Sequence, residues 1–270
     1  MGSRIGSLVL LAAALFGCTI EQRLPRAPSS GELTLRIPPD STIPGGPLGA
    51  AIRRGRALLA KTKDSLPGHV GSALRCFSCH LRDGTQGGAL PLVGVYSRFP
   101  EYRSRNAQVN LLEDRINDCF ERSLNGTALP RDGREMREIV AYLAFMSRGV
   151  APPGVVPGSG LAVILLLTPD SARGRMLFSE TCVRCHGANG EGTLLATPLW
   201  GPRAFNIGAG MARLLTAAAF IRDNMPNDRA ITLTDQQAVD VAAFVVSQPR
   251  PDFARKELDW PLGNPPADLA

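Results

Sequence analysis

The chain has 270 residues, of which 44% are hydrophobic, and this is enough to build two small domains with buried cores. Its formal net charge is +6, from 30 basic and 24 acidic residues. The basic residues form no run with interleaved aromatic side chains, so the charge pattern excludes a nucleic-acid-binding protein.

Residues 1–18 are typical of a signal peptide. Arg4 precedes a short apolar run, Ile5 to Phe16, that is too short to cross a bilayer as a mature helix. The ending Leu15-Phe16-Gly17-Cys18 is similar to a bacterial lipoprotein box, which predicts a lipid anchor at Cys18. Ordinary secretion with cleavage nearby is the alternative. Residues 19–48 are rich in Pro, Gly and Ser and are expected to form a flexible tether from the membrane.

One pentapeptide pattern occurs twice, as Cys76-Phe77-Ser78-Cys79-His80 and as Cys182-Val183-Arg184-Cys185-His186. Cys-Xaa-Xaa-Cys-His is the attachment signal for c-type haem, in which the thiols bond to the porphyrin and the histidine is the proximal iron ligand. A zinc or redox pair of cysteines is the alternative. Two copies, in a chain with only 3 histidines, favour two covalently bound haem c groups. Because this haem is attached outside the cytoplasm, we expect a periplasmic or other extracytoplasmic protein.

The two halves of the chain look like copies of each other. Arg54-Gly55-Arg56-Ala57-Leu58 corresponds to Arg173-Gly174-Arg175-Met176-Leu177, and a haem motif follows each segment. Each half then closes with an apolar helical pattern, over residues 139–145 and 239–245. Thr234 and Gln237 form a capping-box pattern before the second of these helices.

This order of elements predicts an all-α fold of two tandem class I cytochrome c domains. We place the first domain at residues 49–150, with the active-site haem, and the second at 161–250, with the electron-exit haem. The Pro- and Gly-rich segment 151–160 is the expected linker, and 251–270 the expected C-terminal tail.

The sixth ligand of the second haem iron is expected to be Met225, because a Met-Pro pair before the last helix is usual in class I domains. Met211 is the alternative. The same number of positions separates His186 from Met225 and His80 from Cys119. The repeat therefore puts a cysteine where the second domain has its methionine, and His69 is the alternative ligand in the first domain.

Cys119 lies in a predicted helix from Val109 to Leu124 that stops at Asn125-Gly126. Arg115, Cys119 and Ser123 recur every four residues and share one face. Three further arginines lie close in sequence: Arg103, Arg105 and Arg122. A buried structural cysteine beside solvated arginines is the alternative, but a thiolate near cations has a lowered pKa and is a good ligand and nucleophile.

The segment Arg115-Ile-Asn-Asp-Cys-Phe-Glu-Arg-Ser-Leu-Asn-Gly126 resembles the signature of dihaem thiosulfate dehydrogenases. It is more distantly similar to the cytochrome subunit of the Sox thiosulfate-oxidising complex. The resemblance extends from about Arg54 to Pro251. It implies ligation of the first haem by His80 and Cys119, and an electron-exit haem held by His186. Some family members carry a lysine next to the distal methionine, where this chain has Asn224, so exchange between lysine and methionine ligands is not expected.

The resemblance implies oxidation of two thiosulfate ions to tetrathionate, with electrons leaving to an external cytochrome or similar redox carrier. The arginines at 103, 105, 115 and 122 would bring the two dianions together, Cys119 would carry a sulfur-bonded intermediate, and Ser123 would orient an oxyanion. The alternatives are a membrane-anchored electron-transfer cytochrome without a substrate of its own, and a tetrathionate reductase.

Overall fold

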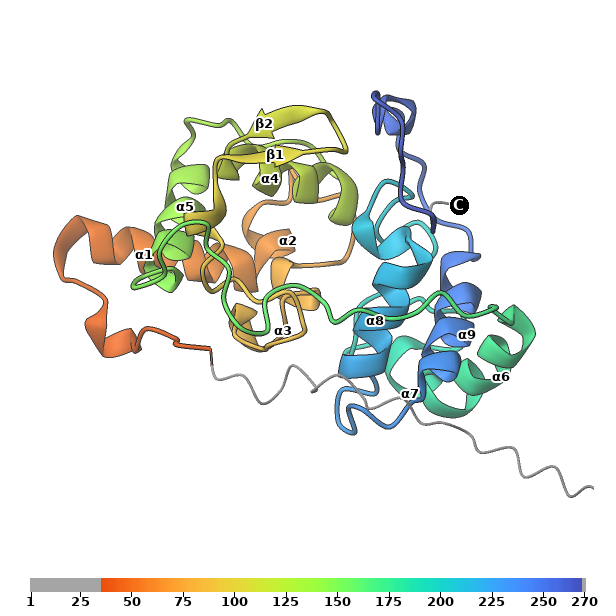
Figure 1. The fold of residues 1–270 in the computed structure, drawn as a ribbon. Helices are drawn as coiled ribbons and strands as arrows, with labels where there is room; N and C mark the ends of the chain where they lie inside the picture. Colours follow the sequence, from red (N-terminus) through yellow and green to blue (C-terminus); the bar gives the residue numbers. More distant parts are fainter. Residues whose placement is uncertain (1–34, 269–270) are drawn as a thin grey trace, which may run out of the picture.

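The computed structural model describes residues 35–268. Figure 1 shows two helical halves side by side, the first containing α1 to α5 and the second α6 to α9, with the segment between them crossing on the outside. The short helices span Thr62–Ser65 (α2), Leu81–Gly84 (α3), Leu112–Asp118 (α4) and Val183–His186 (α7). The described chain is mostly helical, but it also contains a two-stranded sheet, so the expectation of a purely α-helical fold was too strict.

The first half is built on the crossing of α1 (Gly46–Ala60) with α5 (Arg134–Met146). Gly55 lies at this crossing, where a Cβ atom would stand 2.0 Å from the carbonyl oxygen of Glu138. The neighbouring Arg54 donates to the Glu138 carboxylate at 2.6 Å. The glycine therefore permits the close approach of the helices, and the arginine fixes their register.

The second half repeats this arrangement with α6 (Ser171–Thr181) and α9 (Asp235–Val246). A Cβ atom on Gly174 would stand 1.9 Å from the carbonyl oxygen of Asp240, and Arg173 donates to the Asp240 carboxylate at 2.8 Å. The internal repeat seen in the sequence is therefore a repeat of one helix crossing.

Helix α8 (Leu214–Asn224) completes the second half by packing against α9. The predicted capping box of α9 is confirmed, because Gln237 donates its backbone N–H to the Thr234 hydroxyl and accepts from the Thr234 N–H. A cluster of Phe178 from α6, Phe244 from α9 and Trp200 from the loop after the second haem motif packs with ring centroids 5.1–5.6 Å apart.

The helix predicted from Val109 to Leu124 is shorter and less regular than expected. Strands β1 (Glu101–Arg103) and β2 (Gln108–Asn110) form an antiparallel hairpin, with Tyr102 paired to Val109. Helix α4 begins only at Leu112, and its last turn, Cys119–Ser123, is a π-helix. The predicted end of the helix is confirmed by the positive φ of 47° at Asn125.

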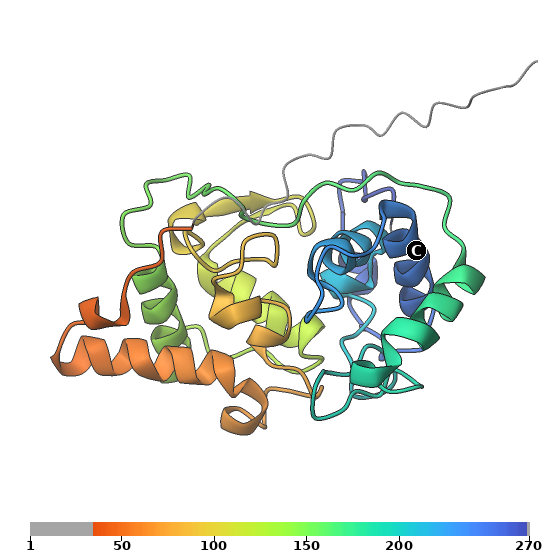
Figure 2. The same ribbon diagram turned by 90° about the horizontal axis from the view of Figure 1, so that it is seen from below.

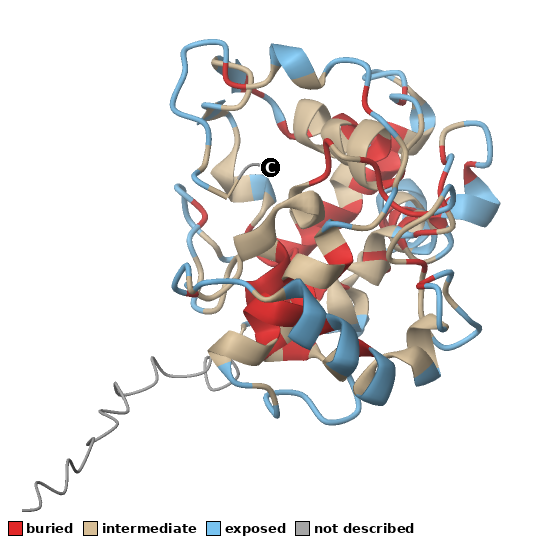
Figure 3. Cartoon of the chain, turned by 90° about the vertical axis from the view of Figure 1, so that its right-hand side faces the viewer, coloured by how far each residue is buried: buried red, intermediate tan, exposed pale blue. Residues whose placement is uncertain are grey.

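The two halves interlock. Phe205 and Ala209, from the loop before α8, belong to the buried apolar cluster of the first half, and Met211 packs against the same cluster. Asn206 is 2% exposed and donates to the carbonyl oxygen of Glu121 at 2.8 Å. In Figure 3 the buried residues concentrate in the central helices, and the exposed residues lie mainly in the outer loops.

Three segments predicted from the sequence to lie outside the two domains make specific contacts with them in the structure. Helix α1 begins at Gly46, inside the expected tether, and Asp40 accepts from Arg56 at 2.8 Å. Gly158, in the expected linker, accepts from the N–H of Gly88 at 2.9 Å. In the expected tail, Trp260 is only 9% exposed.

Seen from below, the first half and the second half remain side by side (Figure 2). Among residues 35–268, no helix combines the length and the apolar character that a bilayer crossing requires. The expected signal peptide and the lipidation site at Cys18 lie outside the described residues.

Candidate active site with two haem-binding motifs

The first haem motif forms a tight turn on the inner side of the first half. Cys76–Ser78 is a 3-10 helix, Phe77 is buried in the core below it, and His80 lies directly before α3. The Nδ1 atom of His80 pairs with the carbonyl oxygen of Leu90 at 2.5 Å. This contact orients the imidazole and leaves Nε2 for a metal, as is usual for a histidine ligand.

The Cys119 side chain faces His80 from the C-terminal end of α4. The Nη1 atom of Arg115 donates to Cys119 Sγ at 2.9 Å. Burial raises the pKa of the Cys119 thiol, but the positive charge of Arg115 and a hydrogen bond with His80 outweigh it and lower this pKa to about 7. The contact predicted between Arg115 and Cys119 on one helix face is therefore present.

Cys76 and Cys79 share this pocket with Cys119. Burial, together with the negative charge of Cys119, raises the pKa of both thiols to about 12. All three cysteines are unpaired and half-buried. Two attachment thiols, a histidine with Nε2 left for a metal, and a facing thiol of lowered pKa form a donor set that fits haem c.

The second haem motif begins at the C-cap of α6 and continues as α7. His186 Nδ1 pairs with the carbonyl oxygen of Thr197 at 3.0 Å, as His80 does with Leu90. Burial lowers the pKa of His186, and this favours the neutral imidazole that binds metals. Cys182 and Cys185 are unpaired and half-buried, so this donor set fits haem c as well.

The two methionine candidates for the second haem are placed differently. Met225 is half-buried at the C-cap of α8, within the second half. Met211 lies in the 3-10 helix Gly210–Ala212 and packs against the core of the first half. Because Met211 already fills a site between the halves, its position favours Met225 as the ligand.

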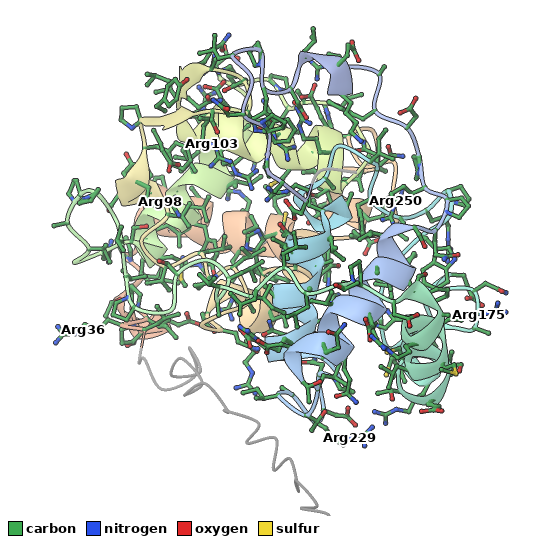
Figure 4. The ribbon with its side chains drawn as sticks, turned by 45° about the vertical axis from the view of Figure 1, so that its right-hand side comes forward. Arg36, Arg98, Arg103, Arg175, Arg229 and Arg250 are labelled. Carbon is green, nitrogen blue, oxygen red and sulfur yellow. The ribbon has the colours of Figure 1, made fainter. Side chains whose placement is uncertain are left out.

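Two of the predicted arginines, Arg103 and Arg105, come from the β-hairpin, whose strand β2 contacts α4. Burial and the positive charge of Arg115 lower the pKa of Arg103, which also contacts Glu101 at 3.5 Å. Burial, followed by the charge of Arg122, lowers the pKa of Arg105 to about 10. Cations that lower each other's pKa form a region of positive potential, which suits an anion. Figure 4 places Arg103 beside α4, whereas Arg175 and Arg229 project from the outer surface of the second half.

Arg122 is already engaged by the C-terminal segment. Its guanidinium donates to both oxygens of Asp259, at 2.7 and 2.8 Å, and lies 4.3 Å from the ring centroid of Phe253. Asp259 is also 3.8 Å from Arg105, which stacks 4.8 Å from the ring centroid of Trp260. Arg105 also donates to the carbonyl oxygen of Gly208 at 2.6 Å. Direct contact with a substrate is therefore better assigned to Arg103 and Arg115.

Sequence reasoning missed the carboxylate of Asp259 and the ring of Trp260, because neither lies near a motif. It also missed Arg213, a cation from the second half whose charge lowers the pKa of Arg105. Ser123 is the last residue of the π-turn and is half-buried. His69 pairs with the carbonyl oxygen of Thr127 at 3.3 Å, which fits a hydrogen-bonded histidine rather than a ligand.

Comparison with known families identifies the class of both halves. Residues 69–151 match the cytochrome c domain of the SoxA/TsdA family, and residues 169–245 match the family of subunit III of cbb3-type cytochrome c oxidase. The chain is therefore a cytochrome c with two such domains, and its cofactor is haem c.

The relatives narrow this class to one family. A thiosulfate dehydrogenase of Psychrobacter arcticus is 43% identical over 249 residues, which are 89% of this chain and 76% of the relative. One from Allochromatium vinosum is 46% identical over 232 residues, 82% of this chain and 86% of the relative. The chain belongs to the thiosulfate dehydrogenase family.

A solved structure supports this placement. The thiosulfate dehydrogenase TsdBA of Marichromatium purpuratum has a TM-score of 0.77 and 34% identity over 81% of this chain. The match covers 50% of that longer chain, so this protein spans about half of its length.

Proposed function

We propose that this protein oxidises two thiosulfate ions to tetrathionate and passes the two electrons to an external redox carrier. The observation that carries the proposal is the 2.9 Å contact between Arg115 and Cys119, opposite His80. This contact supports the assignment of Cys119 as a polarised sulfur nucleophile beside the first haem motif, in a chain whose relatives are thiosulfate dehydrogenases.

Two haem c groups are part of this proposal, one in each class I domain. Cys76, Cys79 and His80 would hold the first haem, with Cys119 as the sixth ligand. Cys182, Cys185 and His186 would hold the second, with Met225 as the sixth ligand. The bound haems supply one-electron redox capacity, and the protein supplies orientation and electrostatics.

The main barrier in this reaction is the electrostatic repulsion between two thiosulfate dianions, and the arginines would reduce it. The positive charge of Arg115 acts directly on Cys119, and Arg103 is near enough to Arg115 for their charges to interact. Arg105 extends the positive region toward Arg213 of the second half. Guanidinium groups bind oxyanions through two parallel hydrogen bonds, which fixes orientation as well as charge. We assign contact with substrate to Arg103 and Arg115, and a supporting charge to Arg105 and Arg122.

Cys119 would carry the sulfur. Its thiolate bonds to the terminal sulfur of the first thiosulfate, and two electrons are removed. The terminal sulfur of the second thiosulfate then attacks the sulfur bonded to Cys119, the bond to Cys119 breaks, and tetrathionate leaves with the thiolate regenerated. Arg115 stabilises the departing thiolate, and Ser123, one turn further on, orients an oxygen of the substrate.

The expected location is the periplasm, with a lipid anchor at Cys18. The support is the sequence of the first 18 residues together with the haem motifs, because c-type haem is attached outside the cytoplasm. A Cys18→Ser variant that stays on the membrane in cell fractionation would argue against the anchor.

The test is an anaerobic assay of the purified protein, shown by mass spectrometry of the denatured chain to carry two haems. Tetrathionate should form from thiosulfate with an artificial electron acceptor. Haem reduction without tetrathionate would instead favour an electron-transfer cytochrome with no substrate of its own, and reaction only in the reverse direction would favour a tetrathionate reductase.

A further inference from the structure

One buried amide joins the two halves, between the loop that contacts His80 and the residue proposed to bind the second haem, Met225. Asn224, the last residue of α8, is 1% exposed. Its Nδ2 atom donates to the carbonyl oxygens of Gly88 and Phe220, both at 3.0 Å. Its Oδ1 atom accepts from Gln86 Nε2 at 2.7 Å. Both amide donors and the carbonyl oxygen are thus used, and two of the three bonds cross between the halves.

In the first half, Asn224 bonds to the loop that orients His80. Gly88 lies two positions before Leu90, whose carbonyl oxygen pairs with His80 Nδ1. The same loop is held from outside by bonds from Gly88 and Leu90 to Gly158 and Gly160. Together with these bonds, the bond from Asn224 to Gly88 fixes the position of the Leu90 carbonyl group, which in turn orients the His80 imidazole.

In the second half, Asn224 lies at the start of the turn that contains Met225. Asn224 immediately precedes Met225, and the Met225 N–H closes α8 by donating to Ile221 at 2.9 Å. The bond from Asn224 to the Phe220 carbonyl anchors the same helix end. A displaced Asn224 side chain would thus move the start of the Met225 turn as well as the His80 loop.

We propose that Asn224 is a positioning residue that couples the axial-ligand geometry of the two haems. The inference rests on the proposed ligation by His80 and Met225. Hydrogen bonds behind a ligating histidine fix its orientation and its basicity, and both affect the bound metal. One side chain that braces the His80 loop and the Met225 turn therefore sets the redox potentials of both haems together.

The test uses the full chain loaded with haem and a spectroelectrochemical titration that follows each haem separately. Asn224→Ala should shift the midpoint potentials of both haems and displace the weak absorption of ferric, methionine-ligated haem near about 695 nm. Gln86→Ala removes one of the bonds between the halves and should shift both potentials by less. In the Asn224→Ala background the Gln86 substitution should add little, because the two share one bond.

Gln248→Ala is the matched control, since this amide donates only within its own half, to Phe244 and Ser247. It should leave both potentials unchanged. Should Asn224→Ala load haem poorly, the Gln86→Ala titration carries the test alone. A shift confined to the second haem, or no shift in either variant, would overturn the coupling.

These outcomes are separate from those of the proposed function. Tetrathionate formation by the unmodified protein tests the activity, and Met225→Gly tests the ligand. Neither result depends on the potentials of the Asn224 variants.

Discussion

Cys119 combines features that a structural cysteine does not need. It begins a π-turn at the end of α4, it is half-buried, and its sulfur accepts a hydrogen bond from Arg115. Such turns occur often at functional sites, because the extra residue in the turn redirects the side chains that follow. The lowered pKa of about 7 makes the thiolate accessible near neutral pH.

Cys119→Ala should abolish tetrathionate formation, with kcat/KM reduced by about a hundredfold or more, because the sulfur nucleophile is lost. The visible spectrum of only one haem should change, and both haems should still attach because His80 and His186 are untouched. His69→Ala is the control, since His69 contacts Phe120, the residue after Cys119, and its Nδ1 pairs with the carbonyl oxygen of Thr127. Near-normal activity of Cys119→Ala would refute the mechanism.

Arg115→Ala should lower kcat/KM for thiosulfate by about tenfold to a hundredfold, or roughly 1.4–2.8 kcal/mol, because it removes the charge beside the reacting sulfur. Arg115→Lys keeps the charge without the forked geometry and should retain more activity. Arg131→Ala is the control, because Arg131 is exposed and pairs with Asp114 away from Cys119. Equal activity of Arg115→Ala and the unmodified enzyme would remove Arg115 from the site.

Among the elements, the end of α8 carries the clearest prediction about the second haem. Met225→Gly should abolish the ferric absorption near about 695 nm that marks methionine ligation, whereas Met211→Gly should leave it. The structural reason is that Met211 packs on the core of the first half, and Met225 caps α8 within the second. The opposite pattern would assign the ligand to Met211.

The C-terminal segment, expected from the sequence to be a tail, instead packs against two of the arginines near Cys119. Asp259, with its side chain 5% exposed, neutralises Arg122, and Trp260 stacks on Arg105. Asp259→Asn removes the buried charge that pairs with Arg122 and leaves Asp118, at 3.6 Å, as its remaining acidic partner. The change should destabilise the protein by up to about 3 kcal/mol. Activity should fall as well, because Arg105 loses a neighbour that positions it.

Asp252→Asn is the matched control for this prediction. The Asp252 carboxylate accepts only from the next backbone N–H in the hydrogen bonds of this segment, so thermal unfolding and the thiosulfate KM should stay unchanged. If Asp259→Asn behaves like Asp252→Asn in both measurements, the segment does not support the arginines.

The elements also show what the sequence can and cannot predict. The haem motifs and the α9 capping box are local patterns, and the contact between Arg115 and Cys119 follows from helix periodicity. The bond between Arg122 and Asp259 joins residues 137 positions apart, and the bridge from Gln86 to Asn224 joins residues 138 positions apart. No local pattern encodes such contacts, because they depend on how the halves pack. The hairpin that replaces the start of the predicted helix has the same origin, since pairing with Tyr102 of β1 holds Val109 in a strand.

At the scale of the whole molecule, the two halves are copies of one helix crossing that are held together by specific contacts. Domains joined only by a linker would be expected to move independently. Here Phe205 and Ala209 complete the core of the first half, and the buried amides of Asn206 and Asn224 bond across the boundary. The halves should therefore behave as one unit in unfolding.

Two matched glycines test this. Gly55→Ala would place a methyl group 2.0 Å from a carbonyl oxygen of α5, and Gly174→Ala would place one 1.9 Å from a carbonyl oxygen of α9. Each change must separate a helix pair and should cost about 1–3 kcal/mol. Gly210→Ala is the control, because a Cβ atom there meets nothing within 4 Å.

Because the halves share a packed boundary, they should unfold in one thermal transition, and the spectra of both haems and the helical circular dichroism should all report it. Either substitution should lower the midpoint of that transition. Gly210→Ala should leave that midpoint in place. Two transitions, with Gly55→Ala moving only the first haem and Gly174→Ala only the second, would show instead that the halves fold independently. In that event the contacts of Asn206 and Asn224 would be too weak to join the two haem-binding sites into one structure.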